Sequence, residues 1–197
     1  DNAVSLAKMA GLVRGKIIYG DASGDPAALT VGGANEVLTS DGTDVAWAAA
    51  SGNDVAFAAG ATGDTTLADA TWTKVAWNTE IFDVGGVFAS DKFTVPVGGA
   101  GNYIFLAKGV IDGIGTTNLN KSQLAFYKNG AGLTDGLASG AMTAGSTASD
   151  FQMETSMGIT LAEADYIEVY AYMDSADSAA GRFQGSTNGG FWGFKLA

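Results

Sequence analysis

The chain has 197 residues, enough for one domain with a sizeable core and a smaller element beside it. Its formal net charge of −11 disfavours binding to nucleic acid and to anionic membrane surfaces, because like charges repel. It contains no Cys and no His, which excludes a disulfide scaffold, Ser-His-Asp and Cys-His catalysis, and the usual zinc sites.

The sequence predicts neither membrane insertion nor an export leader. No apolar run reaches the ~18 residues that cross a bilayer, and no basic segment followed by an apolar one opens the chain. Because the chain starts at Asp1, inside a patterned segment and without Met, we expect it to be part of a longer polypeptide.

The first predicted element is a short amphipathic helix over Ala3–Leu12. Val4, Leu6, Met9 and Val13 stand near helical spacing there. A helix of this length is unstable alone in water, so we expect Leu6 and Met9 to contact identical copies in an oligomer.

Short apolar pieces alternate with turn signals up to about residue 52. None of them is large enough to form its own core, so residues 1–52 are predicted to be an extended stalk that closes only against other copies. The pieces are Lys16–Tyr19, Ala28–Val31, Glu36–Thr39 and Val45–Trp47.

Three blocks of this segment resemble the repeated connector of bacteriophage tail-fibre and related appendage proteins. They are Asn2–Ala10, Tyr19–Ala27 and Gly33–Gly42. The resemblance covers about a quarter of the chain. It implies a trimeric virion fibre or spike that meets other virion proteins through its stalk.

From residue 53 onward the pattern changes to bulky residues in short strands, joined by polar loops. This pattern predicts an all-β jelly-roll sandwich head over residues 53–197. The expected strands are Val55–Ala59, Thr71–Trp77, Glu80–Phe88, Phe93–Val97, Tyr103–Leu106, Leu124–Gly130, Asp165–Tyr172 and Phe191–Leu196.

These residues resemble the globular head of complement component 1q, a relative of the tumour necrosis factor jelly roll. The family signature Phe-Thr-x-Pro-x-x-Gly-x-Tyr-x-Phe has a counterpart in Phe93–Phe105, stretched by extra glycines. The Lys-Asn-Gly hairpin matches Lys128–Gly130, and the closing strand matches Gly190–Leu196. The resemblance implies a ten-stranded sandwich that packs as tight trimers and binds ligands through exposed loops.

Alternation along residues 166–173 predicts two chemically different strand faces. One face carries Ile167, Val169, Ala171 and Met173 and should lie in the core. The other carries Glu168 with three tyrosines. We expect these tyrosines to form a subunit contact, and the alternative is cover by a loop of the same chain. The three are Tyr166, Tyr170 and Tyr172.

Trp192, Phe194 and Leu196 share one face of the terminal strand, opposite Gly193 and Lys195. We expect the three large side chains to fill the core, with a functional role for Trp192 as the alternative.

Three polar stretches are predicted to be loops: Asp112–Ser122, Ala131–Asp150 and Asp174–Asn188. Binding specificity concentrates in such loops, although any single residue there can equally be a solvated connector. The candidate receptor-facing residues are Asp112, Asn118, Asp135, Asp174, Asp177 and Arg182.

The remaining chemistry is sparse. Glu163 with Asp165, or Asp174 with Asp177, could supply oxygen ligands to Ca²⁺, but solvated carboxylates explain these pairs as well. No carboxylate spacing indicates a glycoside-hydrolysing cleft, and the glycine-rich run Gly98–Gly101 lacks the residues of a phosphate loop. We therefore expect no catalytic residue, cofactor or metal.

The sequence thus favours a non-enzymatic homotrimeric phage appendage, located on the virion, that attaches to a host surface glycan or protein. A capsid decoration or head-fibre protein that binds only virion partners is the nearest alternative. A glycan-degrading enzyme and a secreted bacterial adhesin are further classes that the sequence leaves open.

Overall fold

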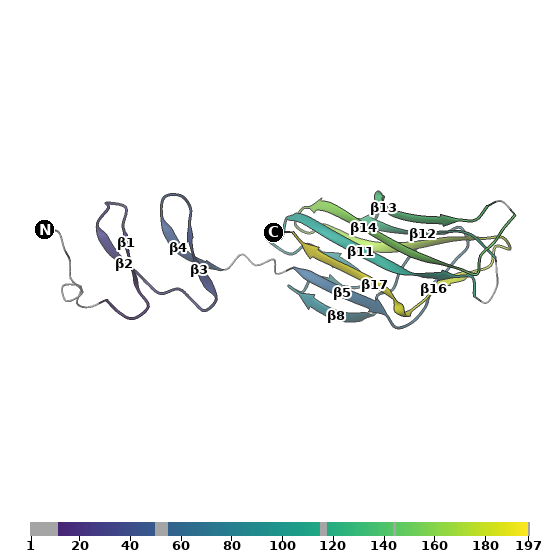
Figure 1. Ribbon diagram of the computed structural model, residues 1–197, viewed down its shortest axis with the longest axis horizontal. Coiled ribbons are helices and arrows are strands. Elements are labelled where there is room, and N and C mark those ends of the chain that lie inside the picture. Colours follow the sequence, from purple (N-terminus) through teal and green to yellow (C-terminus); the bar gives the residue numbers. More distant parts are fainter. Residues whose placement is uncertain (1–11, 50–54, 115–117, 144, 197) are drawn as a thin grey trace. The chain divides into compact units, whose positions relative to one another are not determined.

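The computed structural model describes residues 12–49, 55–114, 118–143 and 145–196. The chain divides into two compact units, Asp1–Gly52 and Asn53–Ala197, called here the N-terminal unit and the head (Figure 1). The helix predicted over Ala3–Leu12, with Leu6 and Met9, lies outside the described residues except for Leu12. The described residues form strands and no helix, so none of them belongs to a helix that could span a membrane.

The described part of the N-terminal unit consists of two antiparallel β-hairpins. In the first, β1 (Ile17–Gly20) pairs with β2 (Pro26–Leu29). In the second, β3 (Glu36–Ser40) pairs with β4 (Val45–Ala49). These strands lie close to the four short pieces that the sequence predicts.

An aspartate closes the turn of each hairpin in the same way. The Asp21 carboxylate accepts hydrogen bonds from the backbone N–H groups of Ser23 (2.9 Å) and Asp25 (3.0 Å). The Asp41 carboxylate accepts them from Thr43 and Asp44, both at 2.8 Å. The two hairpins therefore repeat one local design, an Asx-type turn between short strands.

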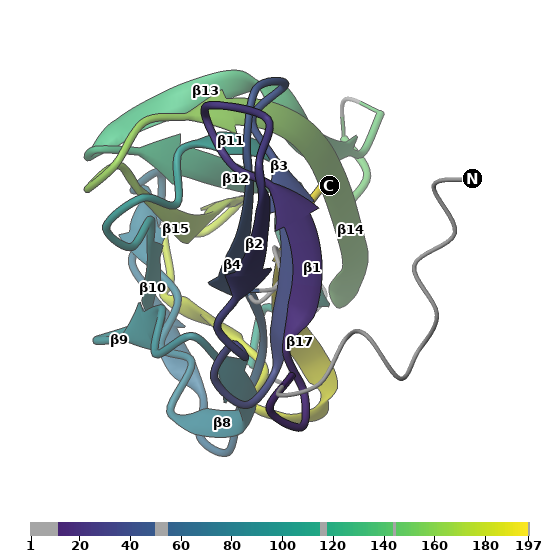
Figure 2. The ribbon, with the colours of Figure 1, turned by 90° about the vertical axis from the view of Figure 1, so that its left-hand side faces the viewer.

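The head is a sandwich of two antiparallel sheets, seen end-on in Figure 2 with β15, β10 and β9 on one side and β14 and β17 on the other. The β17 sheet contains β5 (Ala56–Ala61), β6 (Thr65–Leu67), β8 (Thr79–Val84), β11 (Gly101–Asp112), β14 (Asp150–Leu161), β16 (Gly181–Phe183) and β17 (Ser186–Lys195). The β15 sheet contains β7 (Thr73–Lys74), β9 (Phe88–Ala89), β10 (Lys92–Thr94), β12 (Leu119–Lys128), β13 (Ala131–Ala141) and β15 (Tyr166–Ser175).

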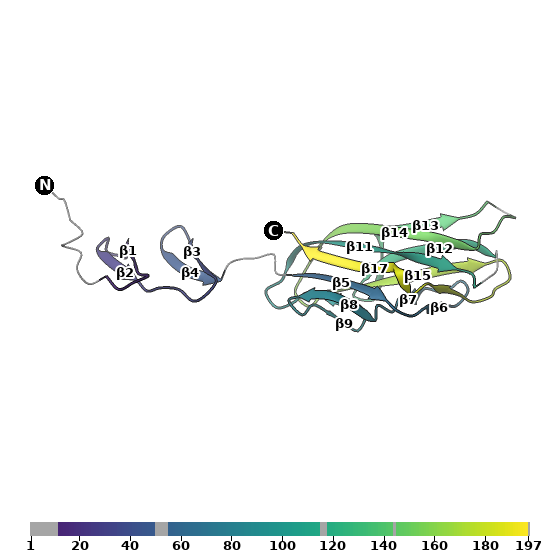
Figure 3. The ribbon, with the colours of Figure 1, turned by 60° about the horizontal axis from the view of Figure 1, so that its bottom comes forward.

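The strand order places elements from both ends of the head side by side. In the β17 sheet, β14, β11, β17, β5 and β8 follow one another, as Figure 3 shows, and β16 and β6 continue beside the far end of β11. In the β15 sheet the order is β13, β12, β15, β10 and β9, with β7 pairing with β15 beside β10. The jelly-roll prediction for the head is thereby confirmed.

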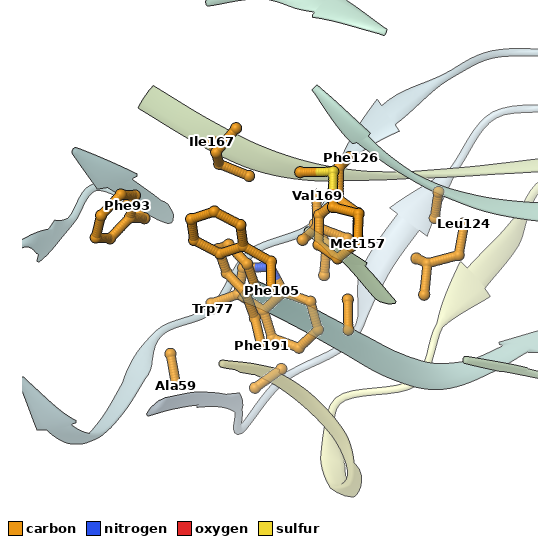
Figure 4. Close-up of a cluster of buried hydrophobic side chains, with 14 of the residues drawn as sticks. Ala59, Trp77, Phe93, Phe105, Leu124, Phe126, Met157, Ile167, Val169 and Phe191 are labelled. Atoms are coloured by element: carbon orange, nitrogen blue, oxygen red, sulfur yellow. The ribbon is translucent and has the colours of Figure 1, made fainter. Parts of the chain in front are cut away.

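Aromatic side chains from both sheets form the core. The Phe57 ring lies 4.7 Å from Phe191 and 5.0 Å from Phe88, and the Phe105 ring lies 5.1 Å from Phe93. Figure 4 shows Phe93, Phe105 and Phe191 gathered with aliphatic neighbours of the same cluster. Edge-to-face and offset ring pairs of this kind add to the free energy gained from burial.

The predicted faces of β15 are confirmed. Ile167, Val169, Ala171 and Met173 are fully buried in the core. The tyrosines of the same strand point to the opposite side of the sheet and are half-buried.

The predicted orientation of the terminal strand is wrong. Phe191 and Gly193 point into the core, whereas Phe194 and Leu196 are each 40% exposed and Trp192 is half-buried. The reason is steric: a Cβ atom at position 193 would lie 2.5 Å from Phe105 Cδ1 and 2.6 Å from Phe57 Cε1. Only a glycine fits on that side, and strand alternation then turns the neighbouring aromatics outward.

Several loop boundaries also differ from the prediction. Ala131–Asp150 contains the strand β13, which pairs with β12 although it is built from small residues, and only residues 142–149 connect it to β14. The long strand β14 was not predicted, although its alternate residues from Met153 to Leu161 point into the sandwich. The expected strand Thr71–Trp77 is reduced to the two residues of β7.

The contact at Gly193 can be tested by adding one methyl group. Gly193→Ala should lower the free energy of unfolding by about 1–3 kcal/mol, because the new Cβ overlaps two core rings. Urea denaturation at a fixed protein concentration measures the change. Gly158→Ala, on β14 of the same sheet, is the matched control, because a Cβ there meets only the Tyr103 carbonyl oxygen at 3.9 Å. Equal stability of both variants would contradict the proposed origin of the register.

Candidate functional site

The outer side of the β17 sheet carries two rows of apolar residues that run across its strands. In one row Ile104 pairs with Phe194, which pairs with Ala56, and Ala56 with Val84. In the next row Leu106 pairs with Trp192, which pairs with Ala58, and Ala58 with Phe82. We call this surface the apolar face; its members are Ala56, Ala58, Phe82, Val84, Ile104, Leu106, Trp192 and Phe194.

Several of these side chains are open to solvent, whereas Ala58 is buried. Phe82 and Val84 are each 47% exposed, and Ile81 beside them is 62% exposed. An open hollow of about 260 Å³ lies at one end, where Asn102 and Leu196 line it. A run of exposed apolar side chains across several strands is unusual for a monomer and typical of a contact surface.

Charges lie at the border of the apolar face. Lys108 Nζ sits 5.6 Å from the centroid of the Trp192 ring, and Glu154 is its cross-strand neighbour on β14. Ile81, Lys108 and Trp192 also line a larger hollow of about 540 Å³ between β5, β8 and β17. The two apolar rows themselves contain no charged residue.

The outer side of the β15 sheet is different, because it is aromatic and cationic. The Tyr127 and Tyr170 rings are stacked with their centroids 3.9 Å apart, and Trp72 lies 5.9 Å from Tyr127 and 5.4 Å from Tyr172. We call this surface the tyrosine face; its members are Trp72, Tyr127, Tyr166, Tyr170 and Tyr172. All five side chains are half-buried.

Three lysines lie among these rings. Lys74 forms an ion pair with Glu168 (2.8 Å) and also donates to the Ser90 carbonyl (2.8 Å). Lys92 Nζ lies 4.5 Å from the centroid of Tyr166, and Lys121 Nζ lies 5.4 Å from that of Tyr172. Such cation–π contacts leave the ammonium hydrogen atoms free to meet a further acceptor.

The hydroxyl groups of Tyr127 and Tyr170 stay protonated at neutral pH. Burial raises the pKa of Tyr127, and the neighbouring Tyr170 raises it further. Burial likewise raises the pKa of Tyr170, with a smaller contribution from Glu168. These hydroxyls can therefore donate hydrogen bonds.

The contacts of the tyrosine face bear on the two interpretations of Tyr166, Tyr170 and Tyr172. Trp72 and Tyr127 of the same chain cover part of their rings, which agrees with the alternative of cover from within the chain. A role of the three tyrosines in subunit contact stays a prediction.

Two of the predicted receptor-facing residues form an ion pair. Arg182 donates to the Asp112 carboxylate through Nη2 (2.7 Å) and Nε (3.1 Å), and to Asp64 through Nη1 (2.8 Å). Burial raises the pKa of Asp112, but hydrogen bonds from Arg182, Gln184 and the Ile114 backbone outweigh it and lower the pKa overall. Asp112 is only 9% exposed, so this pair holds the loops together and offers a ligand little access.

The other loop candidates are dispersed. Asn118 donates from Nδ2 to Asp177 Oδ1 (2.8 Å). The pKa of Asp177 is lowered by two hydrogen bonds, the larger effect coming from the backbone N–H of Ala179 and the smaller from the Asn118 amide. Asp174 lies on β15 opposite Lys121, and Asp135 is exposed on β13. Their role in receptor contact stays a prediction.

Three of the four carboxylates considered for Ca²⁺, those of Glu163, Asp165 and Asp177, have protein partners. Glu163 accepts from the backbone N–H of Gly98 (3.0 Å), and Asp165 is paired with Lys128 (2.8 Å). Within the described ranges, no three acidic side chains come together at a place that could hold a metal ion.

The sequence interpretation missed the apolar face and the part that Trp72 and Tyr127 play in the tyrosine face. The residue that could have revealed the apolar face is Gly193, because its lack of a side chain marks the inward side of β17. The second depends on pairing between β7, β12 and β15, which lie far apart in the sequence.

Comparisons with known proteins identify the fold. No family model matches the chain, and no curated protein matches it. Among solved structures, the globular domain of zebrafish complement 1qA protein is 14% identical with a TM-score of 0.50, covering 73% of this chain and 98% of that one. Murine APRIL is 13% identical with a TM-score of 0.50, covering 72% and 98%. The head therefore has a jelly-roll fold like those of complement component 1q and tumour necrosis factor.

The Lys128–Asp165 pair predicts a pH dependence of stability. Hydrogen bonds from Lys128, Asn129 and the Ala162 backbone lower the pKa of Asp165 to about 2. A carboxylate with a depressed pKa stabilises the fold above its ordinary pKa of 3.8, and this contribution is lost as the pH falls towards 2.

Asp165→Asn should therefore lower the melting temperature at pH 7, and most of the difference from wild type should be gone at pH 2, where about half of the wild-type carboxyls are protonated. Circular dichroism melting at both pH values measures it. Asp135→Asn removes the same charge from an exposed residue that has no bonded partner among the described residues, and should leave the melting temperature at pH 7 unchanged. A constant difference at all pH values would contradict the role of the ionised carboxylate.

Proposed function

We propose that this chain is a non-enzymatic homotrimeric binding module of a phage virion appendage, a tail fibre or spike, that attaches the particle to a host surface. The head fold supports a binding module, since complement 1q-like and tumour necrosis factor-like domains typically form homotrimers that bind partners. The phage assignment is supported by the connector-like blocks in residues 2–42.

The observation that carries the trimer is the apolar face. Copies that each carry a formal charge of −11 repel one another, so a stable contact must bury apolar area where charges are few. The two rows from Ile104 to Val84 and from Leu106 to Phe82 meet both requirements. We therefore assign the subunit contact to the apolar face, in preference to the tyrosine face.

The N-terminal unit supports the same conclusion independently. Seven large apolar side chains of its described residues are at least 40% exposed: Leu12, Val13, Ile17, Ile18, Val31, Val37 and Leu38. A two-stranded hairpin is at best marginally stable in water by itself. Association with identical hairpins would bury these side chains, as expected of a stalk.

A trimer would strengthen weak attachment. Three heads present the same surface three times, so contacts of low individual affinity combine into avidity. No chemical step is needed for this function, and a chain without His and Cys lacks the commonest general base and the cysteine nucleophile.

The oligomeric state tests the proposal. Sedimentation equilibrium at micromolar concentration should give about three times the 19.9 kDa mass of one chain. Phe194→Asp should give a folded protein whose assembly has a lower mass than the trimer, because the substitution places a charge in the centre of the apolar face. Ser139→Asp adds the same charge to an exposed position on β13 and should leave the mass unchanged.

Two results would overturn the assignment. A well-folded wild-type monomer would contradict the proposed trimer. If Tyr170→Asp, and not Phe194→Asp, lowers the mass, the subunit contact lies on the tyrosine face.

The place on the particle requires a separate experiment. A density map of the intact virion should show a threefold-symmetric appendage into which the head fits, and labelled protein should bind host cells. Firm binding to virions together with negligible binding to host cells would favour the capsid decoration or head-fibre alternative.

A further inference from the structure

We propose that the tyrosine face binds an acidic glycan chain that lies along β15. This inference rests on the proposed binding function and names the surface and the chemical class of its ligand. Four observations carry it: the tyrosine hydroxyls, the free ammonium groups, their spacing along the strand, and the charge of the rest of the chain.

The tyrosine hydroxyls are unused within the described chain. Those of Tyr127, Tyr166, Tyr170 and Tyr172 make no hydrogen bond with any described residue, and none is sealed from solvent. Each can therefore donate to or accept from a ligand. Rigid rings with polar tips, such as these and Trp72, supply contact area at low entropic cost, and they suit sugars, which combine apolar ring faces with hydroxyl edges.

Two ammonium groups on this face are also available. Lys92 and Lys121 contact tyrosine rings and form no ion pair with a described carboxylate, whereas Lys74 is paired with Glu168. Three lysines face two carboxylates here, Glu168 and Asp174, so the local charge is 3 − 2 = +1 in a chain of −11. A ligand with anionic groups is attracted to this face and repelled elsewhere.

The spacing of the two free lysines indicates an extended ligand that carries more than one negative charge. Lys92 is the cross-strand neighbour of Glu168, and Lys121 that of Asp174, six residues further along β15 (174 − 168 = 6). At ~3.3 Å per residue the two positions are about 20 Å apart, with the stacked rings between them. A polyuronate carries its carboxylates at intervals that such a row can match.

Two other polymers fit less well. Nucleic acid carries a charge every ~1.7 Å of duplex and would meet far more repulsion from a chain of −11 than two free lysines offset. An acidic peptide that adds a strand needs a free sheet edge, whereas this face presents side chains.

Affinity electrophoresis of the full chain through gels containing one polymer each tests the proposal. Polygalacturonate should retard the trimer, and more so at low salt. Neutral dextran, polyglutamate and double-stranded DNA should retard it much less.

Variants locate the site. The double change Lys92→Gln with Lys121→Gln should weaken polygalacturonate binding about tenfold, the loss expected for two partly exposed ion pairs. Trp72→Ala should weaken it without changing the charge. Arg14→Gln removes a charge from an exposed position of the N-terminal unit and should leave binding unchanged. Sedimentation and thermal melting of each variant confirm that trimer and fold persist.

The outcomes separate this inference from the proposed function. If polygalacturonate does not retard an intact trimer, the proposed glycan site is wrong and the proposed trimer is unaffected. Equal retardation by dextran overturns the charge selectivity, and equal retardation by polyglutamate or DNA overturns the ligand class. Loss of trimer mass in the lysine or Trp72 variants would show that the tyrosine face is a subunit contact and overturn the inference.

Discussion

The close approach of the Phe57 and Phe105 rings to the backbone of Gly193 is the contact on which the apolar face of the head depends. The two rings fill the space beside β17, so its inward position must lack a side chain. That requirement fixes the phase of the strand, because a shift by one residue would exchange its two faces. Trp192 and Phe194 consequently point outward, where they join their neighbours in cross-strand rows.

The two sheets share one core but present unlike chemistry to the outside. The apolar face consists of aliphatic and aromatic side chains without charge, which favours contact between copies that repel one another at long range. The tyrosine face combines rings, hydroxyls and ammonium groups, which favours a polar ligand. With the proposed subunit contact on one face and the proposed ligand on the other, a trimer would form without hiding its binding surface.

Local patterns in the sequence predict the parts of this fold that follow strict alternation. The core side of β15, the short hairpin strands and the jelly-roll class all follow from residues close together in the chain. The orientation of β17 does not, because it is decided by Phe57 and Phe105, which come from distant strands. The same holds for β13, whose small residues become a strand only through pairing with β12, and for the ring cluster formed by Trp72. The alternation of β14, in contrast, was readable in the sequence.

The repeated turn design of the N-terminal unit has an evolutionary consequence. Asp21 and Asp41 each complete their own loop with local backbone amides, so neither hairpin needs the other to close. A gene segment that encodes one such hairpin could be duplicated with its turn intact, together with the linking contact in which Trp47 Nε1 donates to the Thr30 carbonyl (2.8 Å). The length of the N-terminal unit would then change in discrete increments while the head stays the same, which allows the two units to evolve separately.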